Sequence, residues 1–229
     1  MTRRTIWTLI FAALGLAFLL GLGTWQVQRH FWKQGILTEM EARLTDAPVA
    51  LPAEPDPQTH RYLAVELSGS FTDEELRVMA SQREAGPGYR LIAAFETDQS
   101  RRILVDRGFI PAEAANEPRP SVEASINGNL HWPEEADLFT PDPDDGLWFA
   151  REVAPMARAL DTEPVLVVLR STSEAAPPAR PLPLDTSAIP DNHRNYAITW
   201  YLLALAWAVM TGAFLWRIRQ RNRDVAGAG

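Results

Sequence analysis

Two long runs without a charged residue, one near each end of the chain, constrain this sequence more than any other feature. The first covers residues 6–25 and the second covers residues 196–216. A helix rises 1.5 Å per residue, so about 20 residues span about 30 Å, the thickness of a hydrocarbon core. Trp7, Trp25, Tyr196 and Trp216 lie near the ends of the runs, as is typical of membrane interfaces. We therefore expect two transmembrane helices.

Positive charges outside the two runs predict how the helices are oriented. Arg3 and Arg4 precede the first run, and four arginines follow the second: Arg217, Arg219, Arg221 and Arg223. Because such residues favour the cytoplasmic side, we expect both termini in the cytoplasm and the intervening domain across the membrane. With no separate transit peptide, a bacterial inner (cytoplasmic) membrane with a periplasmic domain is favoured. The alternative is a cleaved signal peptide, which the length of the first run disfavours.

Composition excludes several classes of function. Residues 26–195 hold 16 Lys and Arg against 28 Asp and Glu, a net charge of -12, which argues against a nucleic-acid partner. The chain has no cysteine, so it has no disulfide, no CxxC redox pair, no cysteine-ligated metal and no covalent haem attachment through CxxCH.

The segments between and around the runs give a domain plan. Proline clusters at 48–57 and 177–190 bracket a core of ordinary domain size. In order, we expect a cytoplasmic N-terminus (1–5), a transmembrane helix (6–25), an amphipathic helix and Pro-rich linker (26–60), a periplasmic α+β domain (61–173), a Pro-rich linker (174–195), a second transmembrane helix (196–216) and a cytoplasmic tail (217–229).

Short apolar or alternating segments predict the fold of the core. They are bounded by Gly, Pro and Asp, and they cover 62–68, 76–81, 89–95, 103–109, 122–130 and 165–169. Residues 86–88 and 97–100 read as connections between strands, and 153–160 as a short helix. The fold class is therefore a membrane protein whose two transmembrane α-helices flank an α+β, mainly antiparallel β extramembrane domain, with an open sheet or a partly closed barrel.

The sequence motifs of common enzymes and metal sites are missing. There is no HExxH, GxSxG or Walker motif. The spacing of Asp142, Asp144 and Asp145 departs from an EF-hand loop and favours a Pro-Asp-rich turn. His131 with Glu134 and Glu135 is weak evidence for a metal, and surface residues are the preferred interpretation. His60, in a polar linker, is expected to be solvated.

Small residues recur every four positions in both spans. They are Ala13, Ala17 and Gly21 in the first span and Ala204, Ala208 and Gly212 in the second. Close helix packing along these residues is one interpretation, and the ordinary abundance of alanine and glycine in membrane helices is the other.

The outer ends of the two spans bring imidazoles to one level of the membrane. His30 follows the first span and His193 precedes the second, each about one helical turn beyond the apolar run. If the spans form a hairpin, they share a layer with Trp25, Arg29, Arg194, Tyr196 and Trp200. An imidazole can ligate haem iron, aromatic rings can flank the macrocycle, and arginine can pair with propionates. The same residue types are also ordinary at a membrane interface, so both interpretations stay open at this point.

Four segments, taken in order, resemble the surfeit locus protein 1 family. They are Leu22-Gly23-Thr24-Trp25-Gln26 with Arg29, Lys33 and Leu37; Leu104-Val105-Asp106-Arg107-Gly108-Phe109-Ile110-Pro111; Trp148-Phe149-Ala150-Arg151-Glu152-Val153; and Pro190-Asp191-Asn192-His193-Arg194-Asn195-Tyr196-Ala197-Ile198-Thr199-Trp200. The resemblance covers nearly the whole chain. Asp106, Phe109, Glu152 and Asp191 depart from the usual residues at their positions, which are Asn, Trp, Asp and Asn.

The resemblance implies an assembly factor for haem-copper cytochrome c oxidase rather than an enzyme. It implies haem a as a transient cargo bound through His193. Arg29, Arg194, Trp25, Tyr196 and Trp200 are weaker candidates for the same site, based on their proximity to His193. The implied partners are oxidase subunit I, the haem a synthesis machinery and the lipid bilayer. Arg107, Gly108 and Arg151 are interpreted as structural, a glycine for a tight turn and arginines that satisfy carboxylates or carbonyls. A scaffold that stabilises a subunit I intermediate without binding haem is the alternative, and a membrane-anchored enzyme ranks last.

Overall fold

A computed structural model of the chain describes residues 3–144, 146–186 and 189–227. The chain forms two compact units, which are described separately: a helix pair from residues up to Thr38 and from Ser187 onward, and a sheet domain, Glu39–Thr186. Asp145 of the expected Pro-Asp turn, the outermost residues of both predicted tails and residues 187–188 of the second linker lie outside the described residues.

Two helices carry the apolar runs. Helix α1 covers Arg3–Thr45 and helix α3 covers His193–Gly227. Within them, Ile6–Thr45 and His193–Gln220 are long and apolar enough to cross a membrane. The segment expected to form a separate amphipathic helix after the first span is instead the last part of α1. The helix continues because no proline interrupts it before Pro48, three residues beyond its end.

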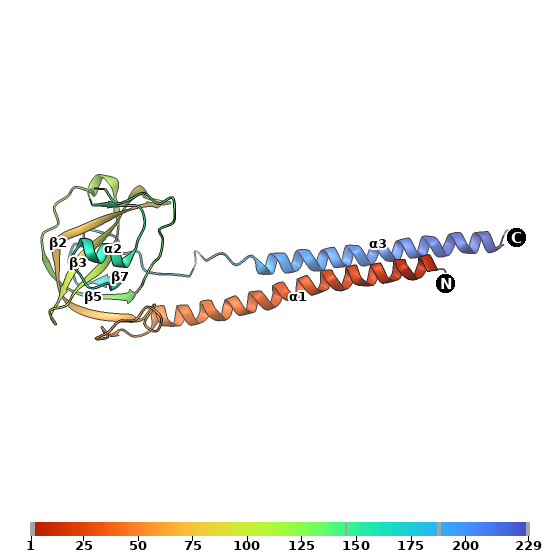
Figure 1. The fold of residues 1–229 in the computed structure, drawn as a ribbon, viewed down its shortest axis with the longest axis horizontal. Helices are drawn as coiled ribbons and strands as arrows, with labels where there is room; N and C mark the ends of the chain where they lie inside the picture. The colour runs from red at the N-terminus through yellow and green to blue at the C-terminus, as the bar shows by residue number, and fades with distance from the viewer. Residues whose placement is uncertain (1–2, 145, 187–188, 228–229) are drawn as a thin grey trace. The chain divides into compact units, whose positions relative to one another are not determined.

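Helices α1 and α3 lie side by side and antiparallel within the helix pair (Figure 1). Trp207 donates its indole N–H to the carbonyl of Ala12 at 3.0 Å, and Thr24 and Tyr201 share a hydrogen bond of 3.2 Å between their hydroxyls. The less exposed residues of α3 recur every three or four positions and form one face: His193, Ala197, Trp200, Ala204, Trp207, Thr211, Leu215 and Ile218. This spacing is the seam of a coiled-coil-like pair.

The stripe of small residues is mostly not the packing face. A methyl group added to Gly21 or Gly212 would meet no atom within 4 Å, whereas one added to Gly15 would come within 2.8 Å of the Trp207 ring. Gly23 packs equally closely on Tyr201. Of the predicted stripe, Ala204 alone is buried. The helices therefore meet where a glycine faces an aromatic ring, a pairing that a search for regularly spaced small residues does not detect.

The sheet domain is built on a mixed sheet with one short helix. In its described residues the strands are β1 (Val49–Ala50), β2 (Ala64–Gln82), β3 (Gly86–Thr97), β4 (Arg102–Pro111), β5 (Val122–Leu130), β6 (Leu147–Trp148) and β7 (Leu166–Thr172). A 3-10 turn, η1 (Ala112–Ala114), follows β4, and helix α2 (Val153–Ala159) precedes β7. The fold class predicted from the sequence is confirmed.

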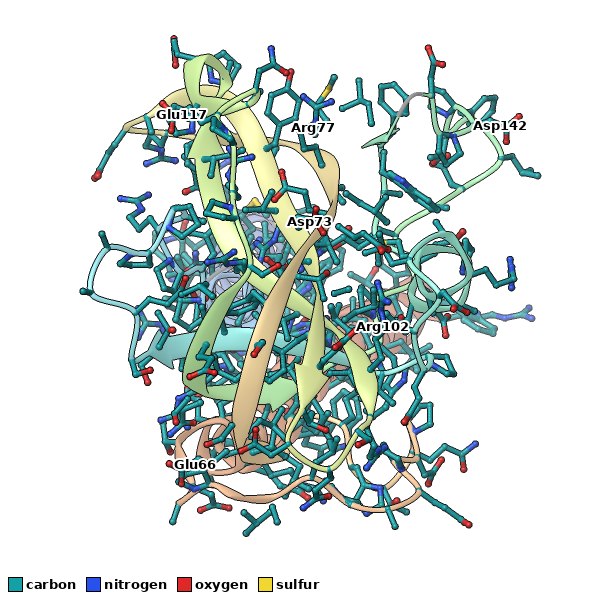
Figure 2. The ribbon with its side chains drawn as sticks, turned by 90° about the vertical axis from the view of Figure 1, so that its left-hand side faces the viewer. Glu66, Asp73, Arg77, Arg102, Glu117 and Asp142 are labelled. Carbon is teal, nitrogen blue, oxygen red and sulfur yellow. The ribbon has the colours of Figure 1, made fainter. Side chains whose placement is uncertain are left out.

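The sheet closes on itself. The strand order is β1-β2-β3-β4-β7-β5, and β5 pairs again with β2. Strand β2 is long enough to serve both neighbours: residues 64–71 pair with β5, and residues 69–82 pair with β3 across an irregularity between Phe71 and Glu75. Figure 2 shows Glu66, Asp73 and Arg77 spread along this strand. The pairings among the long strands are antiparallel, except that β4 and β7 run parallel, and the two-residue strands β1 and β6 each pair parallel with β2.

The interior of the closed sheet is apolar. Phe71 and Phe95 pack edge to face with their ring centroids 4.9 Å apart, and both are fully buried, as are Ile103, Leu104 and Leu166. Burial of side chains of this size supplies about 1.5–3 kcal/mol each, so this cluster contributes much of the stability of the domain.

Candidate functional site

His193 is held by a side chain from the opposite helix. It is the first residue of α3, and its Nδ1 lies 2.7 Å from Oε1 of Gln26 on α1. An amide oxygen only accepts hydrogen bonds, so Nδ1 carries the proton and donates it. The second ring nitrogen, Nε2, then keeps its lone pair, and no hydrogen bond within the described residues engages it. His193 therefore presents a nitrogen that can bind a metal.

His30 is oriented in the same way, but by a carboxylate. Its Nδ1 lies 2.7 Å from Oδ2 of Asp191, which also accepts a hydrogen bond of 3.0 Å from Nε2 of Gln34. The other carboxylate oxygen of Asp191 accepts the backbone N–H of His193 at 3.2 Å. The hydrogen bond from Gln34, followed by those from His30 and the His193 backbone, lowers the pKa of Asp191 to about 2. One ionised side chain thus orients the His30 ring and binds the backbone of His193.

The remaining predicted site residues lie on α1 and α3 and differ in exposure. Trp200 lies half-buried on the face of α3 that packs on α1. Trp25 and Tyr196 are more than half exposed, and Arg194 is exposed. Arg29 is also exposed and stacks its guanidinium over the Trp32 ring of its own helix, 3.8 Å from the centroid. The helix pair therefore supplies a fixed His193 with exposed aromatic and cationic side chains on nearby turns of both helices.

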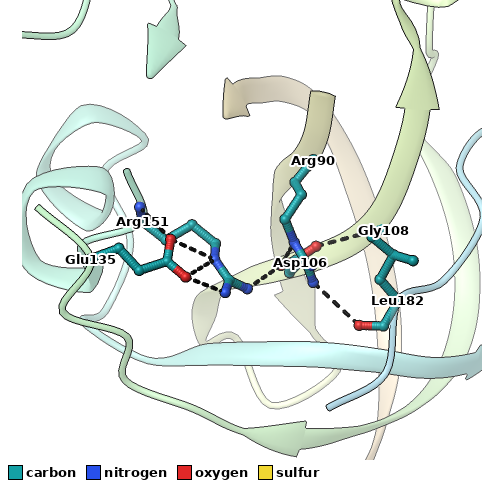
Figure 3. A network of polar contacts seen from close by, with 6 residues as sticks. All are labelled: Arg90, Asp106, Gly108, Glu135, Arg151 and Leu182. Atoms are coloured by element: carbon teal, nitrogen blue, oxygen red, sulfur yellow. Dashed lines mark hydrogen bonds and ion pairs between the residues drawn. The ribbon is translucent and has the colours of Figure 1, made fainter. Parts of the chain in front are cut away.

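A second polar cluster lies inside the sheet domain, at Asp106 of β4 (Figure 3). The fully buried Asp106 carboxylate receives Arg90 Nε at 2.7 Å and Arg151 Nη1 at 3.1 Å. Arg151 also donates hydrogen bonds to the Glu135 carboxylate, from its guanidinium and from its backbone N–H. Burial raises the pKa of Glu135. The hydrogen bonds and the charge of Arg151 outweigh burial, so the pKa lies below its usual value. Every charge in the cluster has a counter-charge, so the arrangement is structural.

Arg107 and Gly108 form a bulge in β4. Leu91 pairs with Gly108 but Ile92 pairs with Asp106, so Arg107 is the extra residue. Its buried guanidinium pairs with Glu174 and lies 3.9 Å from the centroid of the Phe71 ring. Gly108 has φ +110°, and a Cβ there would lie 2.0 Å from the carbonyl oxygen of Arg180. The structural interpretation of Arg107, Gly108 and Arg151 is confirmed, although the glycine serves a bulge and a close backbone contact instead of a tight turn.

The expectations for two histidines outside the helix pair hold only in part. His131 is mostly buried and stacks on Tyr62 at 5.7 Å between centroids, although Glu134 and Glu135 lie at the surface as expected. His60 is partly exposed, and its Nδ1 also accepts the backbone N–H of Asp56 at 2.9 Å, which orders a turn. Among the described residues, no three His, Asp or Glu side chains form a group that could hold a metal ion.

The sequence of this chain matches a known protein family over most of its length. The model of the SURF1 family matches residues 13–205, which include most of α1, the whole sheet domain and the first part of α3. The chain belongs to the SURF1 family. Surfeit locus protein 1 of Rattus norvegicus is 32% identical over 225 residues, covering 87% of this chain and 72% of that protein. The proteins of the same name from Xenopus tropicalis and Homo sapiens are 33% and 31% identical, each over 81% of this chain and covering 68% and 70% of their own length.

Sequence reasoning missed the residues that orient the two histidines. The residue types of Gln26, Gln34 and Asp191 do not single them out in the sequence, because amides and carboxylates are common on the protein surface. Only the antiparallel pairing of α1 and α3 brings residue 26 opposite residue 193 and residue 30 opposite residue 191.

Proposed function

We propose that this protein is an assembly factor for haem-copper cytochrome c oxidase that holds haem a at the outer face of the membrane and assists its insertion into subunit I. The SURF1 family, to which the chain belongs, is known as a family of cytochrome oxidase assembly factors and not as an enzyme family. Haem a is the cargo in this proposal and subunit I is its acceptor.

The hydrogen bond between His193 and Gln26 carries the haem part of the proposal. Histidines that bind metals usually donate their second ring N–H to a carboxylate, carbonyl or water, which fixes the tautomer. His193 already has this arrangement, with Nδ1 bound and Nε2 free. An amide acceptor polarises the ring less than a carboxylate does, and a moderate donor suits a cargo that must later be released.

The chemistry of the surrounding side chains fits a haem. The exposed rings of Trp25 and Tyr196, with Trp200, supply aromatic surface for a macrocycle, and Arg29 and Arg194 supply cations for its propionates. When bound, haem a contributes the iron and its redox chemistry. The residues of this chain bind it, orient it and keep it at the level of the membrane.

We also propose a membrane location and a set of partners for the protein. It lies in a bacterial inner (cytoplasmic) membrane with two spans, cytoplasmic termini and a periplasmic domain. The arginines outside the two apolar runs support this orientation. Besides subunit I, the proposed partners are the haem a synthesis machinery, which would deliver the cargo, and the lipid bilayer.

The first experiment is the absorption spectrum of the full chain purified from cells that make haem a. We expect a near-stoichiometric Soret band in the wild type and its loss in His193→Ala. His60→Ala is the matched control, because that ring orders a turn in the sheet domain, and it should keep the band. Gln26→Leu removes only the acceptor for Nδ1–H, so it should weaken haem retention about tenfold, within the range seen when such outer partners of a metal ligand are lost.

The outcomes separate the ligand from the function. A band kept in His193→Ala and lost in His30→Ala would move the iron ligand to His30, whose ring Asp191 orients. The absence of a band in every protein, with oxidase assembly still dependent on the chain, would refute haem binding in favour of a scaffold for the subunit I intermediate.

A further inference from the structure

The most exposed apolar side chains of the sheet domain lie next to each other, between β5 and β6. Leu138 is 98% exposed and Phe139 is 90% exposed. Among the described residues 39–144 and 146–186, the next most exposed large apolar side chains are Met79 at 54% and Val49 at 48%. Two adjacent large side chains this far out of the fold contribute nothing to its core. Such exposure is typical of a surface that another molecule covers.

The backbone beneath these two side chains is held in place. The N–H of Asp137 donates to Oγ1 of Thr140 at 2.9 Å, and the hydroxyl of Thr140 donates to Oδ1 of Asp137 at 3.0 Å. The same carboxylate accepts the N–H of Phe139 at 2.9 Å. Pro141 and Pro143 restrict the chain that follows. Because the loop is already ordered, a partner that covers Leu138 and Phe139 would lose little affinity to ordering it.

The charge around the pair indicates what kind of partner fits. Residues 134–144 contain Glu134, Glu135, Asp137, Asp142 and Asp144 and no lysine or arginine. All five are exposed, and of these Glu135 pairs with Arg151. Asp142 is labelled on this loop, at the periphery of the sheet domain, in Figure 2. A negative loop is repelled by anionic lipid headgroups and attracted by a basic protein surface.

We propose that residues 134–144, the acidic loop, dock a protein partner that has an apolar pocket bordered by lysine and arginine. Leu138 and Phe139 occupy the pocket, and the surrounding carboxylates face its basic border. This goes beyond the proposed haem function, since the loop belongs to the sheet domain and its docking does not require haem to be bound.

The test places a photoreactive benzoylphenylalanine at position 139 of the full chain, in membranes of cells that make the oxidase. A matched protein carries the same probe at Met79, the next most exposed apolar position of the domain. We expect one discrete adduct with a second protein from position 139 and none from position 79. Mass spectrometry should find the cross-link in a partner segment where apolar residues adjoin lysine or arginine. The yield should fall at least about fivefold in 0.5 M salt, through screening, and with Leu138→Ser, through lost burial.

Several results would overturn the proposal. One is the absence of any adduct from position 139. Another is an adduct with lipid or with a second copy of the chain. The last is an adduct whose yield is insensitive to both salt and Leu138→Ser. The double variant Leu138→Ser, Phe139→Ser keeps its fold because both residues are exposed, and it should keep the Soret band of the wild type. A missing band in all these proteins, with the adduct intact, would count against haem binding and leave the docking loop supported.

Discussion

At the scale of single residues, Asp191 explains most of the candidate site. Its two carboxylate oxygens reach His30, Gln34 and the backbone of His193. The Asp191 carboxylate accepts the Nδ1–H of His30, which fixes that ring nitrogen as a donor.

His131 gives a prediction about pH. Burial, with smaller contributions from the charges of Arg151 and Arg61, lowers the pKa of His131 to about 4 from its usual 6.5, so the folded protein keeps the ring neutral. The unfolded chain binds a proton near pH 6.5, so stability is full above that pH and falls as the pH drops toward 4. The slope is at most about 1.4 kcal/mol per pH unit.

Proton NMR of the His131 ring in the full chain should give a midpoint near 4. His131→Gln should lower the stability at neutral pH and flatten its dependence on pH between about 4 and 6.5. A midpoint near 6.5 would show that the ring is solvated in the folded protein.

At the scale of elements, the described part of the chain separates the strands and helices that local sequence pattern predicts correctly from those that it does not. Strand β5 matches the predicted 122–130 and helix α2 begins at the predicted residue 153, because alternation and apolar spacing are local properties. The two segments predicted at 62–68 and 76–81 belong to the single strand β2. Residues 86–88, predicted as a connection, already pair with residues 80–82. Glycine and proline indicated a turn there, but the register of the hairpin decides where it lies.

Sequence could not predict the parts of the fold that depend on distant pairing. The parallel pairing of β4 with β7 joins residues about 60 positions apart, and the closure through β2 and β5 joins Ala64 to Asn129. The same holds for Gln26 and His193. The resemblance to the SURF1 family named His193, but only the fold shows what holds its ring.

The bulge in β4 gives a prediction about stability. Gly108→Ala places a methyl group against the Arg180 carbonyl at a φ of +110°, so it should lower the free energy of unfolding by about 3 kcal/mol or more. Gly86→Ala is the control, with φ +75° and no atom within 4 Å of its added methyl, and it should cost about 1–2 kcal/mol. Urea unfolding of the full chain followed by circular dichroism measures both. Equal losses would mean that the close contact at Gly108 contributes nothing.

At the scale of the whole molecule, the plan is two apolar helices and one closed sheet in a single chain. The sequence without cysteine allows a direct test of its orientation. A single Ser81→Cys in the sheet domain and a single Gln220→Cys near the end of α3 each introduce one exposed thiol.

A maleimide that cannot cross membranes should label the thiol at position 81 in cells whose outer barrier is opened. It should label the thiol at position 220 only after the inner membrane is permeabilised. Labelling in the reverse order would place the sheet domain in the cytoplasm and refute the proposed orientation.

The closure of the sheet also fixes the order in which the chain can mature. Strand β5 borders β7, so the ring stays incomplete until residue 172 has been synthesised, and Arg180 must follow before it bonds to Phe109. Until then β4 and β5, the two strands that β7 joins, present unpaired edges to any other strand nearby. Because pairings across such sequence distances form slowly, the nascent domain passes through a vulnerable interval that ends only after β7 has been added. Quality control of this protein is therefore expected to act during its biogenesis, before the sheet has closed.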